Sequence, residues 1–434
     1  MKQLSVILIG AGNRGRAYCT RMNKISDKYK IVALAEPVEL KRKSCAKEYG
    51  IPEDMCFKDW RELLALPKMA DIAVIATLDD DHYHPAMKAI ELGYDLLLEK
   101  PIAQTAEECV DIANAAKERG VKVLICHVLR FTPFYRTVKS ILDSGRIGEV
   151  VSVNATEGVG DVHFSHSFVR GNWYSEKDSN PFILAKCCHD LDIIEWLIGK
   201  RCRRVSSFGS LSYFRPENAP DGAPVQCAGG DCPIADTCPY NSPRIYIDNP
   251  NGFWGKKVFK AVESTTYELS DEELSEALKS SHYGRCVFHA DNDVVDNQTV
   301  NMEFDGGATA TLAVNAFNEG GRYIRIFGTK GELYAFASSP AIHVYTFDDR
   351  KSEDIPVMKT EESITGGHGG GDDGIVLELY NYVSGARYDS SIADISVSVA
   401  NHIIGFAAEE ARHTNTVVDL DEFFKKHGYE NIYI

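Results

Sequence analysis

The stretch VILIGAGNRG, residues 6–15, sets the beginning of the fold. An apolar run leads directly into the pattern G-x-G-x-x-G, and a helical pattern follows over residues 14–22. This order of strand, glycine turn and helix is typical of a dinucleotide-binding unit, because the glycines permit a tight turn, close approach of the pyrophosphate and close helix packing. The phosphates are then expected at the positive end of the helix. The residues expected to contact the cofactor in this loop are Gly10, Gly12, Asn13, Arg14 and Gly15.

An acidic residue, Glu36, ends the next apolar run, residues 31–35. A carboxylate at this position can accept hydrogen bonds from the adenosine ribose hydroxyls, and it repels a 2′-phosphate. The sequence therefore favours NAD over NADP. Two alternatives stay open: basic residues at 41–43 would allow NADP as well, and Glu36 could be a solvated acid at a strand end.

The first third of the chain alternates short apolar runs with helical patterns. This alternation predicts an α/β domain, residues 1–128, in which crossover helices join parallel strands, as in a Rossmann fold. Strands are expected at residues 6–9, 31–35, 72–76, 96–98 and 121–125, and helices at 14–22, 38–49, 85–92 and 106–118.

Residues 129–434 show a different pattern, with longer alternating strands and few crossover helices. They predict an α+β domain with an open, mostly antiparallel sheet. A stretch rich in Pro, Gly, Asn and Cys, residues 214–283, is expected to form an inserted subdomain. Strands are expected at 150–156, 204–211, 298–304, 309–315 and 323–327, and helices at 190–197, 375–383 and 395–412.

The overall composition limits the classes of protein. A chain of 434 residues exceeds what one hydrophobic core usually supports, which fits two domains. Its net charge of −16 argues against nucleic acid or an anionic membrane as the main partner, because both attract cations. No apolar run is long enough for a membrane helix, and the N-terminal run leads into the glycine loop, so we interpret it as a strand and not as a signal peptide. We therefore expect a cytoplasmic protein.

The segment Glu99-Lys100-Pro101 follows the apolar run at 96–98. It places an ionisable pair at the carboxyl end of a predicted parallel strand, which is the edge where such sheets bind ligands. Proline biases the preceding lysine toward an extended conformation. A lysine so placed can reach a substrate hydroxyl near a nicotinamide ring.

Several motifs together resemble the glucose–fructose oxidoreductase / inositol dehydrogenase (Gfo/Idh/MocA) family. They are the glycine loop, Ala76-Thr77 with Asp79 and His82, Glu99-Lys100-Pro101, the run from Leu129 through Arg130 to Pro133, and the run from Ser144 to Val150. The resemblance implies a second domain that holds the substrate, and hydride transfer between a sugar- or cyclitol-like CH–OH group and the nicotinamide. It also implies homodimers or homotetramers built on the sheet face. Cofactor contacts are then expected from Thr77, Asp79, His82, Glu99, Lys100 and Arg130.

The second half of the expected site departs from the family pattern. His189 matches the family histidine, but the position four residues earlier is Ala185 where many members have aspartate, and Lys186 follows it. Alcohol oxidation needs a base for the hydroxyl proton, and a histidine can serve near neutral pH. Two ammonium groups in one pocket, Lys100 and Lys186, would lower each other's pKa, which makes one of them a further candidate base. Alternatively, Lys186 is a surface lysine and His189 a histidine at a buried helix end.

Two polar clusters are expected to recognise a substrate. One loop, residues 157–173, combines histidines, an arginine and a tryptophan, which suit the hydroxyls and the apolar ring face of a sugar. A glycine-rich run at 366–372 surrounds a single histidine and is typical of a loop at a ligand site. The histidines of both clusters, with His189, could instead bind a metal. The expected substrate residues are Glu157, His163, His166, Arg170, Trp173 and His368.

Three cysteines in the insertion follow the pattern C-x4-C-x5-C, at Cys227, Cys232 and Cys238. In a reduced cytoplasm, such a loop favours a structural zinc site. The fourth ligand is open between Cys202, Cys188 and a histidine, and plain buried thiols are an equal alternative.

Three functions are compatible with the sequence. The leading hypothesis is an NAD-dependent dehydrogenase acting on a sugar, glycoside or cyclitol, in which Lys100 and His189 serve the reacting hydroxyl and Lys186 assists. The second is a redox-assisted glycosidase with tightly bound NAD, which oxidises a ring hydroxyl transiently, eliminates the aglycone and re-reduces the product. The third is a non-catalytic NAD-binding regulator, which the retained Glu99-Lys100-Pro101 and His189 disfavour.

Overall fold

The N-terminal domain is built on a six-stranded parallel sheet with the strand order β3-β2-β1-β4-β5-β6. The computed structural model describes residues 2–248, 270–358, 367–388 and 391–427. The predicted Rossmann fold is confirmed, and the two-residue strand β3 and the five-residue helix α3 were not predicted. The strands are β1 (Leu4–Ile9), β2 (Tyr29–Ala35), β3 (Cys56–Phe57), β4 (Ile72–Ile75), β5 (Asp95–Leu98) and β6 (Val123–Ile125). The helices are α1 (Asn13–Lys24), α2 (Glu39–Tyr49), α3 (Trp60–Leu64), α4 (Tyr83–Leu92) and α5 (Ala106–Arg119).

The second domain contains a nine-stranded sheet in the order β14-β13-β12-β11-β7-β10-β9-β8-β15. Among the described strand pairs of this sheet only β7 and β10 run parallel, so the predicted open, mostly antiparallel sheet is confirmed. The strands β12, β13 and β14, which extend one end of the sheet, were not predicted. The strands are β7 (Val150–Gly158), β8 (Cys202–Ser210), β9 (Asn297–Phe304), β10 (Thr309–Asn315), β11 (Gly321–Gly328), β12 (Gly331–Phe336), β13 (Ala341–Thr346), β14 (Ser352–Pro356) and β15 (Val418–Asp419).

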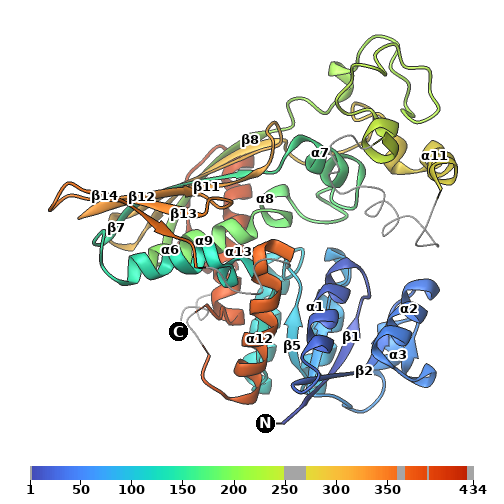
Figure 1. Cartoon of the computed structure of the whole chain (residues 1–434), viewed down its shortest axis with the longest axis horizontal. Coiled ribbons are helices and arrows are strands. Elements are labelled where there is room, and N and C mark those ends of the chain that lie inside the picture. Colours follow the sequence, from blue (N-terminus) through green and yellow to red (C-terminus); the bar gives the residue numbers. More distant parts are fainter. Residues whose placement is uncertain (1, 249–269, 359–366, 389–390, 428–434) are drawn as a thin grey trace.

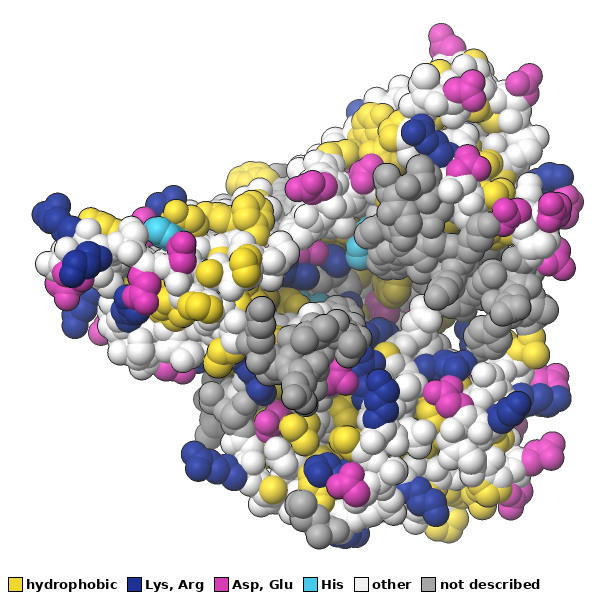
Figure 2. All heavy atoms as spheres, viewed as in Figure 1, with side chains coloured by type: hydrophobic (Ala, Val, Ile, Leu, Met, Phe, Trp, Pro, Cys, Tyr) yellow, Lys and Arg dark blue, Asp and Glu magenta, His cyan; other side chains and the backbone are white. Residues whose placement is uncertain are grey.

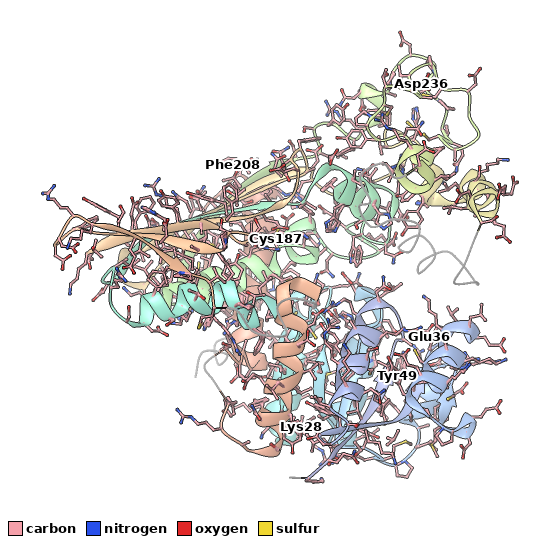
Figure 3. All side chains as sticks on the ribbon, viewed as in Figure 1. Lys28, Glu36, Tyr49, Cys187, Phe208 and Asp236 are labelled. Atoms are coloured by element: carbon pink, nitrogen blue, oxygen red, sulfur yellow. The ribbon has the colours of Figure 1, made fainter. Side chains whose placement is uncertain are left out.

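Helices cover one face of this sheet and leave the other open (Figure 1). The covering helices pack their apolar residues against alternate strand residues, as in Val300 and Leu312, which are both fully buried. On the opposite face, the side chain of Phe208 in β8 is 66% exposed (Figure 3). The helices of this domain are α6 (Pro133–Asp143), α7 (Asp161–Phe164), α8 (Phe182–Ala185), α9 (Cys188–Ile198), α13 (Ile395–Thr414) and α14 (Leu420–His427).

The insertion projects from the sheet and has a small apolar cluster of its own (Figure 1). Its described elements include the π-helix η6 (Arg244–Asp248) and the helix α11 (Asp271–Ser280). Part of the segment predicted as an inserted subdomain, residues 249–269, lies outside the described residues. The cluster consists of Ala228, Ile245, Tyr246, Leu274, Leu278 and Tyr283.

One late helix, α12 (Gly371–Ser384), packs against the N-terminal domain (Figure 1). Its Ile375 and Leu379 belong to the same apolar cluster as Leu8 of β1. A Cβ on Gly371 would meet the Val128 carbonyl oxygen at 2.3 Å, so only glycine allows this close approach. The core of the Rossmann domain therefore includes a helix that lies far along the chain. Among the described helices, none has the length and apolar character that crossing a membrane requires.

A buried histidine on α13 joins the two domains. His402 is fully buried, and its Nε2 accepts a hydrogen bond of 3.2 Å from the backbone N–H of Ile102. The opposite nitrogen, Nδ1, lies 2.7 Å from the Ser398 carbonyl oxygen, which it can reach as a donor. Both contacts suit the neutral ring. Burial is the main cause that lowers the pKa of His402 to about 3, and the neighbouring His127 adds to it.

This histidine makes the stability of the fold depend on pH. In the unfolded chain its ring takes up a proton below its ordinary pKa of about 6.5, whereas the folded chain holds it neutral down to about pH 3. The contribution of His402 is therefore complete above pH 6.5 and is lost as the pH falls through this window. Between pH 6 and 4.5, we expect His402→Gln to reduce the dependence of unfolding free energy on pH by about 1.4 kcal/mol per pH unit.

Urea unfolding at a series of pH values measures this slope. The matched control is His84→Gln, because the His84 side chain is exposed. A His402→Gln slope equal to that of the wild type would show that His402 does not change its protonation on unfolding.

Candidate active site

The glycine loop between β1 and α1 has the geometry of a phosphate cradle. Gly10 has a φ of 88°, and a Cβ there would meet the Ala76 carbonyl oxygen at 2.4 Å. A Cβ on Gly15 would meet the Gly10 carbonyl oxygen at 2.1 Å, so this glycine allows the helix to pack close to the turn. Gly12 has open space within 4 Å of its Cβ position and forms the N-cap of α1 without a side-chain cap. The backbone of this helix end can therefore receive an anionic group.

Glu36 lies beside the same loop, after β2 (Figure 3). Its carboxylate is 5% exposed and accepts hydrogen bonds from the backbone N–H of Ala11 at 2.8 Å and of Val38 at 2.9 Å. Arg42 donates to the Glu36 carbonyl oxygen. The structure thus holds the Glu36 carboxylate against the glycine loop, and the solvated strand-end alternative does not describe it.

An ion network connects the loop to the end of β5. The Arg14 guanidinium lies 2.8 Å from a carboxylate oxygen of Glu99 and 2.8 Å from one of Asp372 at the start of α12. Tyr18 donates a hydrogen bond of 2.6 Å to the same Glu99 oxygen. Although burial acts to raise it, Arg14 and Lys100 hold the pKa of Glu99 below its ordinary value. Arg14 therefore shares its charge between two buried carboxylates.

Lys100 joins the Rossmann sheet edge to the second domain. Its Nζ donates a hydrogen bond of 2.8 Å to the carbonyl oxygen of Ala185, the last residue of α8. The backbone N–H of Lys100 donates to the Glu99 carboxylate, which orients the segment. The predicted lysine thus meets the segment that carries Lys186 and His189.

Lys186 belongs to a charged cluster with strands β7 and β11. Its Nζ lies 3.2 Å from a carboxylate oxygen of Glu157, which is 2% exposed. Arg322, directly opposite Glu157 in the sheet, lies 2.9 Å from the other oxygen and pairs with both oxygens of Asp190. Burial raises the pKa of Glu157, while Arg322 and Lys186 act to lower it. Two cations and two carboxylates therefore compensate one another, and Lys186 is not a solvated surface lysine.

His189 lies in the first turn of α9 and is buried. Its ring is 6.0 Å, centroid to centroid, from that of His127, which in turn is 5.7 Å from the ring of His402. Burial lowers the pKa of His127 to about 4, against the nearby Asp192 carboxylate. At neutral pH, His127 and His402 are therefore uncharged behind His189.

Arg130 pairs with Asp192 on α9. Its guanidinium forms a two-pronged hydrogen bond with Asp192, at 2.8 and 2.7 Å, and both side chains are buried. Asn401 on α13 donates to the same carboxylate at 2.7 Å. Arg130 was expected at the cofactor, but the structure places its guanidinium inside this pair.

The residues after β4 also contact the second domain. Thr77 donates to the backbone of Asp81, and His82, with its Nδ1 2.7 Å from the Pro101 carbonyl oxygen, is 1% exposed. Asp79 accepts hydrogen bonds from the Trp173 indole N–H at 3.1 Å and from the Ser179 hydroxyl at 3.2 Å. Trp173 was expected at the substrate, and the structure places it against Asp79, which was expected at the cofactor.

The remaining substrate candidates separate into two places. Burial, and after it the charge of Lys186, lowers the pKa of His163 to about 2. His166 and Arg170 point toward the insertion: His166 is 2.9 Å from the Tyr246 hydroxyl, and the Arg170 guanidinium donates to backbone carbonyls there. The structure therefore does not gather these two with Lys100. His368 lies in the short helix η10 (Gly367–Gly370), and its side chain is outside the described residues.

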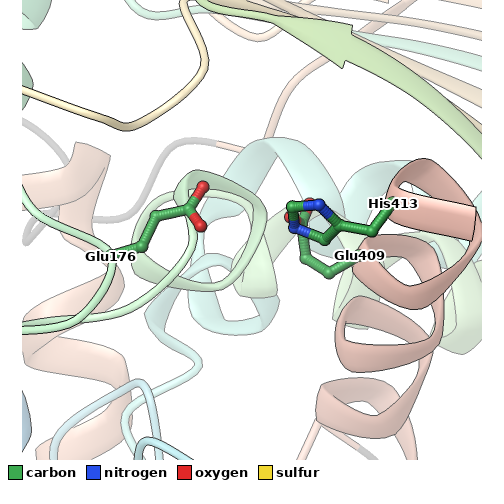
Figure 4. A group of neighbouring side chains, drawn as sticks. All are labelled: Glu176, Glu409 and His413. Atoms are coloured by element: carbon green, nitrogen blue, oxygen red, sulfur yellow. The ribbon is translucent and has the colours of Figure 1, made fainter.

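Figure 2 shows a hollow between the two domains, with basic, acidic and histidine side chains at its floor. The alternative of a metal held by histidines is not found among the residues whose side chains are described, which exclude His368. The one group of potential ligands within 4.8 Å there is Glu176, Glu409 and His413 (Figure 4). Arg412 already lies at 3.3 Å from Glu176 and 2.5 Å from Glu409. This guanidinium supplies the positive charge that the carboxylates need, so the group is an ion pair of the fold.

Sequence reasoning missed several partners that form the site. Asp372, Arg322 and Asp190 were not predicted because each meets its partner across a large separation in sequence. His127 and His402 gave no local motif. Asp372 did carry one signal, since it follows a glycine run immediately before a helix.

Comparisons with known proteins identify the same two domains. The family model described as "Oxidoreductase family, NAD-binding Rossmann fold" matches residues 4–127, and the model of its C-terminal alpha/beta domain matches residues 139–388. The chain is 26% identical over 380 residues to the oxidoreductase YteT of Bacillus subtilis. The alignment covers 83% of this chain and 84% of that protein. It is 23% identical over 342 residues to the scyllo-inositol 2-dehydrogenase (NAD(+)) of the same organism, across 73% of this chain and 95% of the relative.

A solved structure of an oxidoreductase from Agrobacterium radiobacter, in complex with NAD+, L-tartaric acid and magnesium, shares the fold with a TM-score of 0.67. The alignment has 14% identity and covers 97% of this chain and 100% of that one. The two family models together span most of the chain, and their order along it agrees with the two domains of the structure. The chain therefore belongs to the Gfo/Idh/MocA family of NAD-binding oxidoreductases, as its sequence motifs predicted.

Proposed function

We propose that this protein oxidises a CH–OH group of a sugar, glycoside or cyclitol and transfers the hydride to NAD. The observation that carries the proposal is the contact between Lys100 Nζ and the Ala185 carbonyl oxygen. This contact brings a lysine at the ligand-binding edge of the Rossmann sheet against the segment with Lys186 and His189. The similarity to a dehydrogenase of scyllo-inositol, which covers 73% of this chain, supports a polyhydroxylated ring as the substrate class.

The residues of the first domain fit the cofactor. Gly12 leaves room for a pyrophosphate at the N-terminus of α1, and the Glu36 carboxylate lies at the loop where the ribose hydroxyls would bind. Bound NAD supplies the hydride acceptor. The chain itself contributes the anion site, the ribose acceptor and the sheet edge that directs Lys100 toward the second domain.

The second domain supplies the groups that act on the hydroxyl. His189 is the proposed base, and the neutral His127 behind it adds no charge that would oppose its protonation. Lys100 can exchange its hydrogen bond to the Ala185 carbonyl oxygen for one to a substrate oxygen. Lys186, compensated by Glu157, is the proposed second cationic donor to a substrate hydroxyl. His163, whose pKa is lowered by burial and then by the charge of this lysine, is proposed as a further polar contact for the substrate.

A panel of cyclitols, free sugars and glycosides with NAD tests the reaction, with NADH absorbance and product mass recorded together. We expect NADH to accumulate with a product two mass units below the substrate. His189→Ala and Lys100→Met should each lower kcat about 100-fold or more, because each removes a group at the reacting hydroxyl. The matched control is Lys117→Met, which alters an exposed lysine on α5.

Three results would contradict this assignment. Wild-type kcat in both site variants would remove Lys100 and His189 from the chemistry. Glycoside cleavage without net NADH would show a transient oxidation, and the protein would then be a redox-assisted glycosidase. Bound NAD that no substrate of the panel reduces would instead indicate a regulator.

The Glu36 carboxylate is proposed to select NAD over NADP. We expect the wild type to bind NAD at least tenfold more tightly than NADP, and Glu36→Gln to narrow this ratio, because the amide no longer repels the 2′-phosphate. Glutamine can still accept one of the two backbone hydrogen bonds at the loop. Isothermal titration with both dinucleotides measures the ratio, and an unchanged ratio in the variant would place the selectivity elsewhere.

We further propose that two or four copies associate through the open sheet face. The face carries the exposed Phe208 among polar strand residues, and a second copy would cover it. Light scattering coupled to gel filtration should give twice or four times the chain mass, and Phe208→Glu should shift the population toward monomer. Leu66→Glu, at an exposed site of the Rossmann domain, is the control. A monomeric wild type at micromolar concentration would contradict the proposal.

A further inference from the structure

Four cysteines of the insertion surround one small cavity. Cys227, Cys232, Cys238 and Cys286 all line a cavity of about 20 Å³. This volume holds one water-sized particle, which also suits a single metal ion. All four thiols are reduced and partly exposed, unlike Cys188 and Cys202, which are fully buried in the main core. The fourth thiol of the group is therefore Cys286, and neither of the cysteines considered from the sequence.

Backbone pairing brings the distant Cys286 to the cysteine loop. Gln226 and Arg285 form an antiparallel bridge. On either side of it, the Cys227 N–H donates to the Gly284 carbonyl oxygen at 2.8 Å, and the Cys286 N–H donates to the Val225 carbonyl oxygen at 2.9 Å. The first and last thiols thus come from two paired segments. The loop from Cys232 to Cys238 contains two hydrogen-bonded turns. The Ala235 N–H donates to the Cys232 carbonyl oxygen, and the Cys238 N–H donates to the Ile234 carbonyl oxygen.

A buried positive charge and a backbone donor lie beside the cavity. Arg170 lines it, is 1% exposed, and donates to the carbonyl oxygens of Tyr240 and Arg285, next to two of the cysteine segments. Its Nη1 is buried and has no hydrogen-bond partner among the described residues. The Ser242 N–H also donates to the Cys227 sulfur at 3.4 Å. A buried cation and a backbone donor beside four thiols compensate the negative charge that metal-bound thiolates carry.

We propose that Cys227, Cys232, Cys238 and Cys286 bind one zinc ion that holds the insertion together. Four thiolates around one ion are the ligand set of tetrahedral structural zinc. The apolar cluster of the insertion has six buried side chains, and so small a core usually needs a metal or a covalent link. Through Arg170 at the end of the π-helix η4 (Ser165–Arg170), the zinc site also fixes the segment that follows His163.

Zinc binding requires a small closure of the loop. In a tetrahedral site with Zn–S distances of 2.3 Å, the sulfurs lie about 3.8 Å apart. Among the described residues, no three of these sulfurs lie within 4.8 Å of one another. The four sulfurs must therefore move closer together on binding, while the bridge between Gln226 and Arg285 keeps the Cys227 and Cys286 segments side by side.

Metal analysis of the full chain tests this proposal. The protein is purified without a histidine tag and without added metal, and zinc is measured by inductively coupled plasma mass spectrometry. We expect about one zinc per chain in the wild type and less than one fifth of that in Cys232→Ser and Cys286→Ser. Cys56→Ser, which alters a partly exposed cysteine of the Rossmann domain, should keep the full content. NAD binding by each variant shows that the Rossmann domain remains folded.

A second readout identifies the ligands directly. Replacement of zinc by Co²⁺ should give the visible absorption of tetrahedral cobalt with a strong sulfur-to-cobalt charge-transfer band, and a mercurial reagent should release the zinc as the thiols react. The proposal is overturned by a wild type that neither contains nor takes up zinc while its thiols are reduced, by four thiols consumed in disulfides, or by stoichiometric iron and sulfide. Full zinc content in Cys286→Ser would remove Cys286 as the fourth ligand. None of these readouts depends on dehydrogenase activity, so they leave the proposed reaction untouched.

Discussion

The pairing of Arg14 with two buried carboxylates is the constraint on which the rest of the site depends. A buried carboxylate is costly unless it is paired, and Glu99 and Asp372 both satisfy this need with the same guanidinium. Arg14 belongs to the helix that opens at the glycine loop, Glu99 to the end of β5, and Asp372 to a helix from the far end of the chain. One side chain therefore fixes the cofactor loop, the sheet edge and α12 relative to one another. The position of Lys100 follows from this, because its backbone N–H is held by Glu99.

The second domain solves a similar problem with a larger number of charges. Glu157 and Asp190 are buried acids, and Arg322 and Lys186 are their partners. The family pattern has an acid where this chain has Ala185, and the cluster shows how the chain accommodates the difference. Lys186 receives its negative partner from strand β7, and not from its own helix. The Lys186 ammonium is thereby held at the sheet, next in sequence to Ala185, whose carbonyl oxygen accepts the hydrogen bond from Lys100.

Local patterns predicted the parts of the fold that depend on local physics. Apolar periodicity located the strands of the Rossmann sheet, and the glycine spacing located the cradle, because both depend on residues close in sequence. The helix α11 was missed although Ser270 and Glu273 form a capping box, since the predicted inserted subdomain around it shows few periodic signals. The strands β12 to β14 were missed because they are defined by pairing with their neighbours in the sheet, which the local sequence does not show. Asp372, Arg322 and Cys286 could not be predicted, since each acts only through a contact that the complete fold creates.

The histidines show why residue type alone misassigns part of such a site. A neutral imidazole can accept from a backbone N–H and donate to a carbonyl oxygen in the core, as His402 does. No sequence motif marks a histidine in this role. His166, by contrast, is drawn to the insertion by the Tyr246 hydroxyl and the stacked ring of Tyr283. Sequence proximity grouped His166 with His163, but adjacent turns of one short helical segment face different neighbours. The segment therefore carries His166 and Arg170 into the insertion, while the charge of Lys186 acts on His163.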